Sequence, residues 1–370
     1  MRVGCPKEIK TREYRVGLTP ESAAELVRAG HDVLIETKAG EGIGASDDTY
    51  KKIGAKILAD ADAVFQEAEM IVKVKEPQAV EIARLKPSHT LFTYLHLAPD
   101  PEQAEGLMKS GATCIAYETV TDAHGRLPLL KPMSEVAGRM SVHVGAHLLE
   151  KTQGGRGVLM GGVPGVKPAN VIILGAGVAG YNAAQIAVGM RARVVVFDKN
   201  LARLEELDRE FEGRLETIYS TRAAVEEAVQ EADLVVGAVL VAGAAAPKLI
   251  TRAMLKTMRP GSVLVDISID QGGCFETSHA TTHDEPTFVI DDVIHYCVAN
   301  MPGAVSRTSA FALNNATLPF TLALANKGYR QALQDDPHLA AGLNVYEGAI
   351  AHEAVARDLG KPYKRPSWLG

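Results

Sequence analysis

The sequence predicts an α/β protein of two domains, in which a doubly wound parallel sheet with its helices is inserted into a second α/β domain. Residues 171–198 follow the order strand, glycine-rich turn, helix, strand and terminal acid. The first 127 residues alternate short apolar strands with helical patterns, which favours a mostly parallel sheet covered by helices. From Arg307 the pattern is helical, so we expect this part to return to the first domain. The expected domains are residues 1–128 with 307–370, and residues 129–306.

Length and composition agree with this organisation. A chain of 370 residues is long enough for about two domains, each with its own core. Its net charge of −6 shows no basic footprint, so no nucleic-acid partner is expected. The four cysteines lack Cys-x-x-Cys spacing, which favours reduced thiols over a metal site or a disulfide framework. The sequence shows no signal-peptide pattern, and its longest apolar run, residues 234–247, is shorter than a membrane helix. We therefore expect a cytoplasmic protein without membrane spans.

The glycine-rich turn predicts a Rossmann-type dinucleotide site. Gly175, Gly177 and Gly180 form Gly-x-Gly-x-x-Gly directly after the strand Val171–Leu174. Such glycines allow a tight turn, close approach of a pyrophosphate and packing of helix on strand. Asp198 ends the next strand, where its carboxylate can accept ribose hydrogen bonds and repel a 2′-phosphate, so NAD is favoured over NADP. Simple turn glycines are the alternative.

Later strands extend this sheet. We expect strands over Asp233–Leu240, Ser262–Asp270 and Val293–Val298. Ligands of open α/β sheets bind outside the carboxyl ends of strands. The expected contacts with the cofactor cleft are therefore Val239, Leu240, Asp270 and the segment Val298 to Met301.

Two cations of the first domain suit a carboxylate. Arg15 precedes a proline-started helix, and a guanidinium can bind a carboxylate through two hydrogen bonds. A surface arginine is the alternative. Lys75 ends a strand on the same face as Lys73. Alternating lysines are typical of a solvated strand face, yet a binding residue would also emerge at this strand end.

Two further residues suit proton transfer. His96 ends an apolar strand, and histidine donates and accepts protons near neutral pH. A structural histidine is the alternative. Asp270 ends another strand beside Gly272, where it could deprotonate water or an amine, or simply cap a turn. Asp266 is expected to be a buried structural acid. Together with a hydride-accepting cofactor, these residues indicate oxidation of an amino acid or a hydroxy acid.

Helical patterns fill the remaining segments. Ser134 is expected to cap a helix over Glu135–Lys151 that connects the two domains. The other expected helices include Pro20–Gly30, Asp47–Gly54, Pro101–Ser110, Leu201–Glu212, Thr221–Ala232, Leu249–Met258 and Leu339–Leu359.

Motifs along the whole chain resemble one family, that of the L-alanine dehydrogenases and the nucleotide-binding subunits of transhydrogenases. The motifs that carry this resemblance are Met1–Lys10 with Glu13–Val16, Val74–Pro77, Tyr94–Ala98, Pro132–Arg139, Leu174–Gly180, Asp266–Ser278, Val298–Val305 and Ala312–Thr317.

The resemblance implies reversible oxidative deamination of L-alanine to pyruvate and ammonia with NAD. It implies that Arg15 and Lys75 bind the substrate, that His96 is the acid/base, and that Asp270 activates water and handles amine protons. It also implies a homohexamer. The cofactor contacts that it implies are Ser134, Gly177, Val178, Ala179, Gly180, Asp198, Arg203, Ser220, Val239, Leu240, Ile267, Ser268, Ile269, Asp270, Val298, Ala299, Asn300 and Met301.

Two other functions stay open. A transhydrogenase subunit would depend on a partner and have no amino-acid substrate, but the retention of Lys75, His96 and the Asp270 loop, with no membrane segment, argues against it. A catalytically silent NAD-binding protein is the other alternative, because nucleotide motifs alone do not exclude it.

Overall fold

Two α/β units make up the chain, and each is described by itself. The computed structural model describes residues 1–239 and 246–369. Leu240, one of the expected cofactor contacts, lies outside the described residues. The first unit comprises residues 1–133 and 305–370, and the second comprises residues 134–304. Within the described ranges, no helix is both long enough and apolar enough to cross a membrane.

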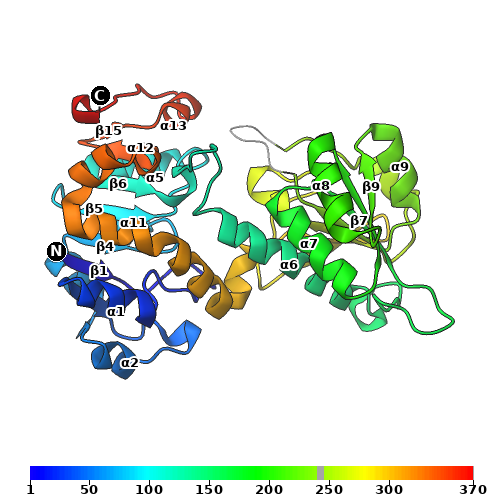
Figure 1. Ribbon diagram of the computed structural model, residues 1–370, viewed down its shortest axis with the longest axis horizontal. Coiled ribbons are helices and arrows are strands. Elements are labelled where there is room, and N and C mark those ends of the chain that lie inside the picture. Colours follow the sequence, from blue (N-terminus) through cyan, green and yellow to red (C-terminus); the bar gives the residue numbers. More distant parts are fainter. Residues whose placement is uncertain (240–245, 370) are drawn as a thin grey trace. The chain divides into compact units, whose positions relative to one another are not determined.

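The first unit is built on an eight-stranded sheet with the strand order β15-β14-β6-β5-β4-β1-β2-β3 (Figure 1). Its strands β1 to β6 are parallel and follow the doubly wound order 3-2-1-4-5-6, so the winding direction reverses between β1 and β4. The elements are β1 (Arg2–Cys5), α1 (Pro20–Arg28), β2 (Asp32–Glu36), α2 (Asp47–Lys52), β3 (Lys56–Leu58), α3 (Ala61–Glu67), β4 (Met70–Val72), α4 (Ala79–Ile82), β5 (Thr90–Thr93), α5 (Pro101–Ser110), β6 (Thr113–Ala116), α11 (Ser306–Asp335), α12 (Pro337–Ala340), β14 (Leu343–Tyr346), β15 (Ala349–Ile350) and α13 (Glu353–Asp358), with short 3-10 helices at Glu41–Ile43, Tyr117–Thr119 and Ser367–Leu369.

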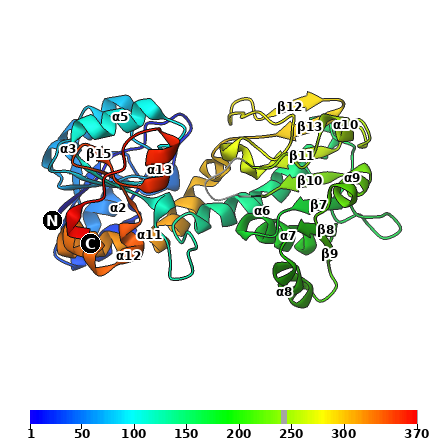
Figure 2. The same ribbon diagram turned by 90° about the horizontal axis from the view of Figure 1, so that it is seen from above.

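Helices cover both faces of this sheet. Successive side chains of a strand point to opposite faces, and buried apolar side chains lie on each face. Val3 and Cys5 of β1 belong to the core that α1 and α11 cover. Gly4 faces α3, where a Cβ atom would lie 2.7 Å from that of Ala68. Figure 2 shows α3 and α5 on one side of the sheet and α11 and α12 on the other.

The helix expected over Leu339–Leu359 is wrong. Strands β14 and β15 form an antiparallel hairpin there, and β14 extends the sheet beside β6. Glu347 and Gly348, which join the two strands, have φ values of 45° and 74°. Two consecutive residues with positive φ are typical of a type I′ hairpin turn, which here joins β14 to β15.

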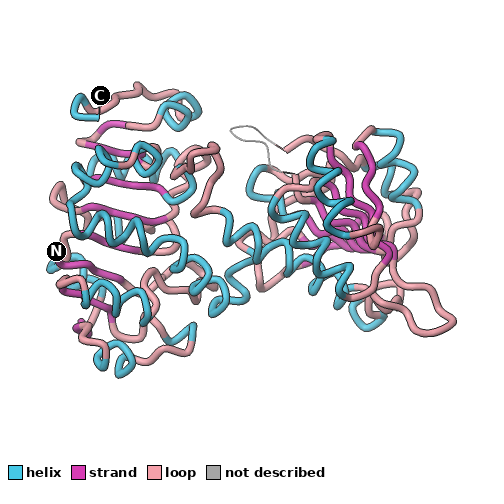
Figure 3. Tube along the Cα trace, in the orientation of Figure 1, coloured by secondary structure: helices cyan, strands magenta, loops and turns pink. Residues whose placement is uncertain are grey.

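The second unit contains a seven-stranded sheet with the order β12-β13-β11-β10-β7-β8-β9 (Figure 3). Only the edge strand β12 is antiparallel, and the others follow the doubly wound order 3-2-1-4-5-6, which confirms the Rossmann-type fold. The elements are α6 (Lys131–Leu148), β7 (Asn170–Leu174), α7 (Val178–Gly189), β8 (Arg193–Asp198), α8 (Leu201–Phe211), β9 (Glu216–Tyr219), α9 (Arg222–Gln230), β10 (Leu234–Gly237), α10 (Arg252–Leu255), β11 (Val263–Asp266), β12 (Thr287–Ile290) and β13 (Val293–Tyr296), with 3-10 helices at Lys151–Gln153, Ile267–Gln271 and Met301–Val305.

Two local expectations in this unit are also wrong. Ser134 does not cap α6, because the helix already begins at Lys131. Pro132 suits such a first turn, where a missing N–H costs no helical hydrogen bond. Asp270 does not end a strand, since β11 stops at Asp266 and Asp270 lies in the 3-10 helix that follows.

Candidate active site

The candidate substrate-binding residues lie beyond the carboxyl ends of the central strands of the first sheet. Lys75 follows β4, at the point where the winding direction reverses, and His96 follows β5. Ligands of open α/β sheets bind at this kind of position. The first unit therefore has a candidate ligand site of its own, although it has no glycine-rich turn.

Arg15 is buried, so the alternative of a surface arginine is wrong. Its side chain is 2% exposed. Its Nε donates to Glu13 Oε1 at 2.7 Å and its Nη2 donates to Glu13 Oε2 at 2.6 Å, while Nη1 lies 3.0 Å from Met133 Sδ. Such a two-bonded pair fixes the plane of the guanidinium. Glu13 thus orients Arg15, a role that the sequence analysis missed.

Lys73 and Lys75 differ sharply, and the alternative of a solvated lysine face is wrong for Lys73. Its side chain is fully buried and pairs with Glu8 and Glu81, whose carboxylate oxygens lie 3.0 Å and 2.7 Å from Nζ. Lys75 is 13% exposed, with Nζ 3.3 Å from Glu76 Oε2. Lysine is rarely buried unless it is paired, and these carboxylates supply the pairing.

His96 has an unusual backbone that Glu118 holds. Its φ is 48°, a left-handed value that is uncommon outside glycine. Glu118 Oε1 accepts the His96 N–H at 2.6 Å, and the same oxygen lies 4.0 Å from the ring Nδ1. Glu118 lies in the 3-10 helix Tyr117–Thr119 directly after β6, and its role was not predicted from the sequence.

Tyr94 connects these residues. Its ring stacks on the ring of His96, with centroids 5.7 Å apart. Burial raises the pKa of Tyr94, which the charge of Arg15 partly offsets, so the hydroxyl stays protonated and donates to Leu129 O at 2.6 Å. The neighbouring Thr93 hydroxyl donates to Lys75 O at 3.0 Å. The end of β5 thus joins the surroundings of Arg15, Lys75 and His96.

The three glycines of the second unit occupy distinct positions in the turn after β7. Gly175 has a φ of 103°, and a Cβ atom there would lie 2.6 Å from Ala238 O. A Cβ atom on Gly180 would lie 1.8 Å from Gly175 O. Gly177 is the N-cap residue directly before α7, and a Cβ atom there would meet nothing within 4 Å. Open space in front of a helix N-terminus fits a pyrophosphate, so the turn suits a dinucleotide.

Asp198, Arg203 and Ser220 lie next to this turn. Asp198 Oδ2 accepts the N–H of Ala176 at 2.7 Å, and Arg203 Nε donates to the Ala176 carbonyl at 2.8 Å. The Ser220 N–H donates to Asp198 O at 2.9 Å. A pocket of about 190 Å³ beside them is lined by Lys199, Ser220, Thr221, Arg222, Val225, Lys248, Leu249, Thr251 and Met254. The carboxyl edge of this sheet thus offers space beside the expected ribose acceptor.

The turn that carries Asp270 is held from both ends. Asp266 is fully buried, as expected, and its side chain accepts the N–H of Ser268 at 3.0 Å. Lys248 Nζ donates to the carbonyl oxygens of Gly272 and Gly273. The Ser268 hydroxyl donates to Val239 O at 2.7 Å, which brings two expected cofactor contacts together. Asp270 itself is exposed on this held turn.

The other expected cofactor contacts belong to the same unit. Val178 and Ala179 open α7, and Ile267 and Ile269 belong to the turn of Asp270. The segment Val298 to Met301 follows β13, where His283 Nε2 lies 3.2 Å from Asn300 O. Ser134 lies in the first turns of α6, and Ala299 donates its N–H to Thr281 O at 3.2 Å.

Comparisons with known proteins cover both units. Residues 4–137 match the family described as "Alanine dehydrogenase/PNT, N-terminal domain", and residues 141–353 match "Alanine dehydrogenase/PNT, C-terminal domain". A protein from Halomonas elongata named alanine dehydrogenase is 61% identical over 363 residues, which are 98% of each chain.

Two solved structures are similar over nearly the whole chain. One, titled L-alanine dehydrogenase, has a TM-score of 0.95 at 52% identity and covers 97% of this chain and 99% of its own. The other, titled a transhydrogenase from Sinorhizobium meliloti, has a TM-score of 0.82 at 25% identity and covers 96% of this chain and 100% of its own. The chain therefore belongs to the alanine dehydrogenase/PNT family along both of its domains.

Proposed function

We propose that this chain catalyses the reversible oxidative deamination of L-alanine to pyruvate and ammonia, with NAD as the hydride acceptor. The observation that carries the proposal is the set Arg15, Lys75 and His96 at the carboxyl edge of one doubly wound sheet, in a chain whose other sheet holds a dinucleotide turn. The name alanine dehydrogenase, which the Halomonas elongata relative carries at 61% identity, supports the choice of amino acid.

The first unit is proposed to bind the substrate. Arg15 and Lys75 would hold the carboxylate and the carbonyl oxygen, since a guanidinium and an ammonium both donate charge-assisted hydrogen bonds. Glu13 bonds Nε and Nη2 of Arg15 and so fixes the plane of the guanidinium toward a substrate. His96 would accept and return a proton at the reacting carbon–oxygen group, and Glu118 would keep its ring in place.

The second unit is proposed to bind NAD, which supplies the hydride acceptor when bound. Gly177 would face the pyrophosphate, and Asp198 would accept hydrogen bonds from the ribose. Asp270 would take a proton from the attacking water and handle the protons of the amine. Ser134, Arg203, Ser220, Val239 and the segment Val298 to Met301 are proposed to complete the cofactor contacts.

Variants that still bind NADH but no longer oxidise alanine distinguish catalytic residues from structural ones. We expect His96→Ala and Asp270→Asn to bind NADH with nearly normal affinity and to lose alanine oxidation by about 10²- to 10⁴-fold, the range for a missing acid or base. The measurement pairs fluorescence titration of NADH with steady-state rates. Near-normal rates in either variant would remove that residue from the proposed chemistry.

The choice of NAD over NADP is tested at Asp198. Replacing Asp198 by Ala removes the carboxylate that would repel a 2′-phosphate, so we expect the preference for NAD in kcat/KM to fall. Asn at the same position keeps the size of the side chain and serves as the comparison. Unchanged discrimination in both variants would show that another group selects the cofactor.

A transhydrogenase subunit is the second candidate, favoured by the TM-score of 0.82 with the Sinorhizobium meliloti structure. It predicts nucleotide binding without alanine turnover.

We also propose a cytoplasmic homohexamer, supported by the family resemblance. Sedimentation of the intact protein should then give a mass six times that of the 39.4 kDa chain, and a monomer would contradict it.

A further inference from the structure

The two lysines that follow β4 have different roles: one is buried in the core, and the other is proposed to bind the substrate. Lys73 is 0% exposed and lies between two carboxylates, Glu8 and Glu81. Lys75, two residues later, is the proposed substrate-binding cation. Three ionisable groups in a protein interior carry a large desolvation cost unless each finds a partner. The two alternating lysines therefore differ in role: Lys73 pairs with acids in the core, and Lys75 lies at the candidate ligand site.

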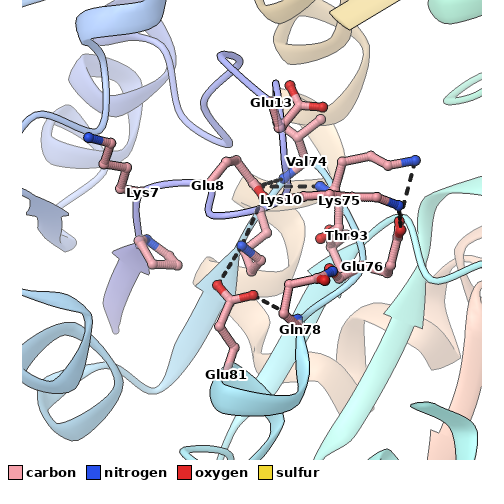
Figure 4. Close-up of polar contacts among 12 residues, drawn as sticks. Lys7, Glu8, Lys10, Glu13, Val74, Lys75, Glu76, Gln78, Glu81 and Thr93 are labelled. Atoms are coloured by element: carbon pink, nitrogen blue, oxygen red, sulfur yellow. Dashed lines mark hydrogen bonds and ion pairs between the residues drawn. The ribbon is translucent and has the colours of Figure 1, made fainter. Parts of the chain in front are cut away.

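Glu8 contacts both lysines, through different oxygens. Its Oε2 lies 3.0 Å from Lys73 Nζ. Its Oε1 accepts the N–H of Val74 at 2.6 Å and the N–H of Lys75 at 3.3 Å (Figure 4). The carboxylate therefore joins the buried ammonium to the backbone that carries the proposed substrate-binding residue.

Glu81 contacts Lys73 but holds a different part of the backbone. Its Oε1 lies 2.7 Å from Lys73 Nζ, and its Oε2 accepts the N–H of Gln78 at 2.8 Å, at the start of α4. Figure 4 shows Glu81 on the far side of this network from Lys75. The two acids share one cation, but only Glu8 bonds the peptide groups of Val74 and Lys75.

The carbonyl of Lys75 is held as well. β4 ends at Val72, so Lys75 lies beyond the strand. The hydroxyl of Thr93, a buried residue at the end of β5, donates to Lys75 O at 3.0 Å. The side chain of Glu8, from the loop after β1, and that of Thr93, at the end of β5, thus hold the N–H and the carbonyl of Lys75 in place of strand pairing.

We propose that Glu8 is a positioning residue for the reaction, which sets the place of Lys75 from a carboxylate anchored on Lys73. This inference rests on the proposed function, in which Lys75 binds the substrate. A displacement of about 1 Å at a binding group can cost a large factor in rate or affinity. Loosening the backbone of Lys75 should therefore weaken pyruvate binding and leave the nucleotide site unchanged.

Glu8→Gln and Glu81→Gln form a matched pair of variants. Each removes one ionised partner of Lys73 and keeps the size of the side chain. A glutamine at position 8 has an NH2 donor in place of one carboxylate oxygen, and this donor cannot accept from the Lys73 ammonium or from the backbone N–H groups, so one of the two contacts is lost. We expect Glu8→Gln to raise KM for pyruvate about tenfold, with an unchanged dissociation constant for NADH. Glu81→Gln should keep KM within about twofold of the wild type while losing comparable thermal stability.

A second pair tests the other contact of Lys75 and does not depend on the folding of Glu8→Gln. Thr93→Val removes the hydroxyl that bonds Lys75 O, and Thr93→Ser keeps it. We expect a several-fold rise in KM for pyruvate with valine and its restoration with serine. Equal KM values in these two variants, or in Glu8→Gln and Glu81→Gln, would overturn the positioning role. Absence of pyruvate turnover in the wild type would instead contradict the proposed function itself.

Discussion

Charge pairing decides where the cations of the first unit lie. Arg15 is buried because Glu13, two residues earlier, forms two hydrogen bonds with it. Lys73 is buried because Glu8 reaches it from 65 residues away. A sequence pattern shows the charges but not which acid meets which base, so it left a surface Arg15 and a solvated Lys73 open as alternatives. It nevertheless selected Lys75 and His96 as candidates from their strand-end positions.

Removing the charge of Lys73 should be costly. Lys73→Met leaves Glu8 and Glu81 buried without their cation, and we expect a loss of about 3 to 5 kcal/mol in the free energy of unfolding. Lys56→Met is the control, because Lys56 pairs with Glu67 at 2.8 Å on the exposed surface. That change should cost less than about 1 kcal/mol. Urea unfolding of both variants checks this, and equal losses would contradict the account of the buried pair.

The cysteines should be unreactive in the folded protein. All four are buried, and burial raises the pKa of the Cys5, Cys114 and Cys297 thiols to about 12. We expect a chromogenic thiol reagent at pH 8 to label none of them rapidly in the native protein and all four after unfolding. Rapid labelling of a native thiol would show that the core is open at that residue.

The raised pKa values of these thiols also predict that the folded protein is less stable at alkaline pH. Because the folded thiols have a pKa above the ordinary value of 9.0, the unfolded chain loses its protons first as the pH rises. The buried thiols therefore contribute their full stabilisation below about pH 9, and this stabilisation is lost as the pH rises towards 12. Cys5→Ala should therefore lessen the loss of stability between pH 8 and pH 10.5, measured by urea unfolding, and an unchanged loss would exclude Cys5 as a contributor.

At the scale of single elements, the glycine-rich turn was predictable and the strand ends were not. Gly175 and Gly177 lie between β7 and α7, and Gly180 lies in the first turn of α7, as the motif requires. The apolar run to Ile269 hid the end of β11, because the side chain of Asp266 begins a 3-10 turn that residue types alone do not reveal. The hairpin of β14 and β15 was missed because its turn is Glu-Gly and not one of the strongest hairpin sequences.

Two alanine substitutions in the turn should have opposite effects. At Gly177 a Cβ atom meets nothing within 4 Å, so we expect Gly177→Ala to keep the melting temperature and to weaken NADH binding at least tenfold by filling the space for the pyrophosphate. At Gly180 a Cβ atom would lie 1.8 Å from Gly175 O, so Gly180→Ala should lower the melting temperature. Calorimetry and NADH titration distinguish the two. Normal NADH affinity in Gly177→Ala would place the pyrophosphate elsewhere.

At the scale of the whole molecule, both units share one winding order. The sequence predicted it for the second unit from the motif at Gly175, whereas the first unit showed only alternating strands and helices. The strand order 3-2-1-4-5-6 in each sheet places candidate ligand residues beyond the carboxyl ends of the central strands. This order comes from pairing between distant segments, such as β1 with β4, which local patterns do not record.

The proposed reaction of this chain is the oxidation of L-alanine with NAD. The most direct measurement is the initial rate of NADH formation from L-alanine and NAD at alkaline pH, together with NADH consumption in the presence of pyruvate and ammonium. We expect turnover in both directions, and none when ammonium or L-alanine is left out. Tight binding of NADH by the purified protein, with no turnover in either direction, would contradict it.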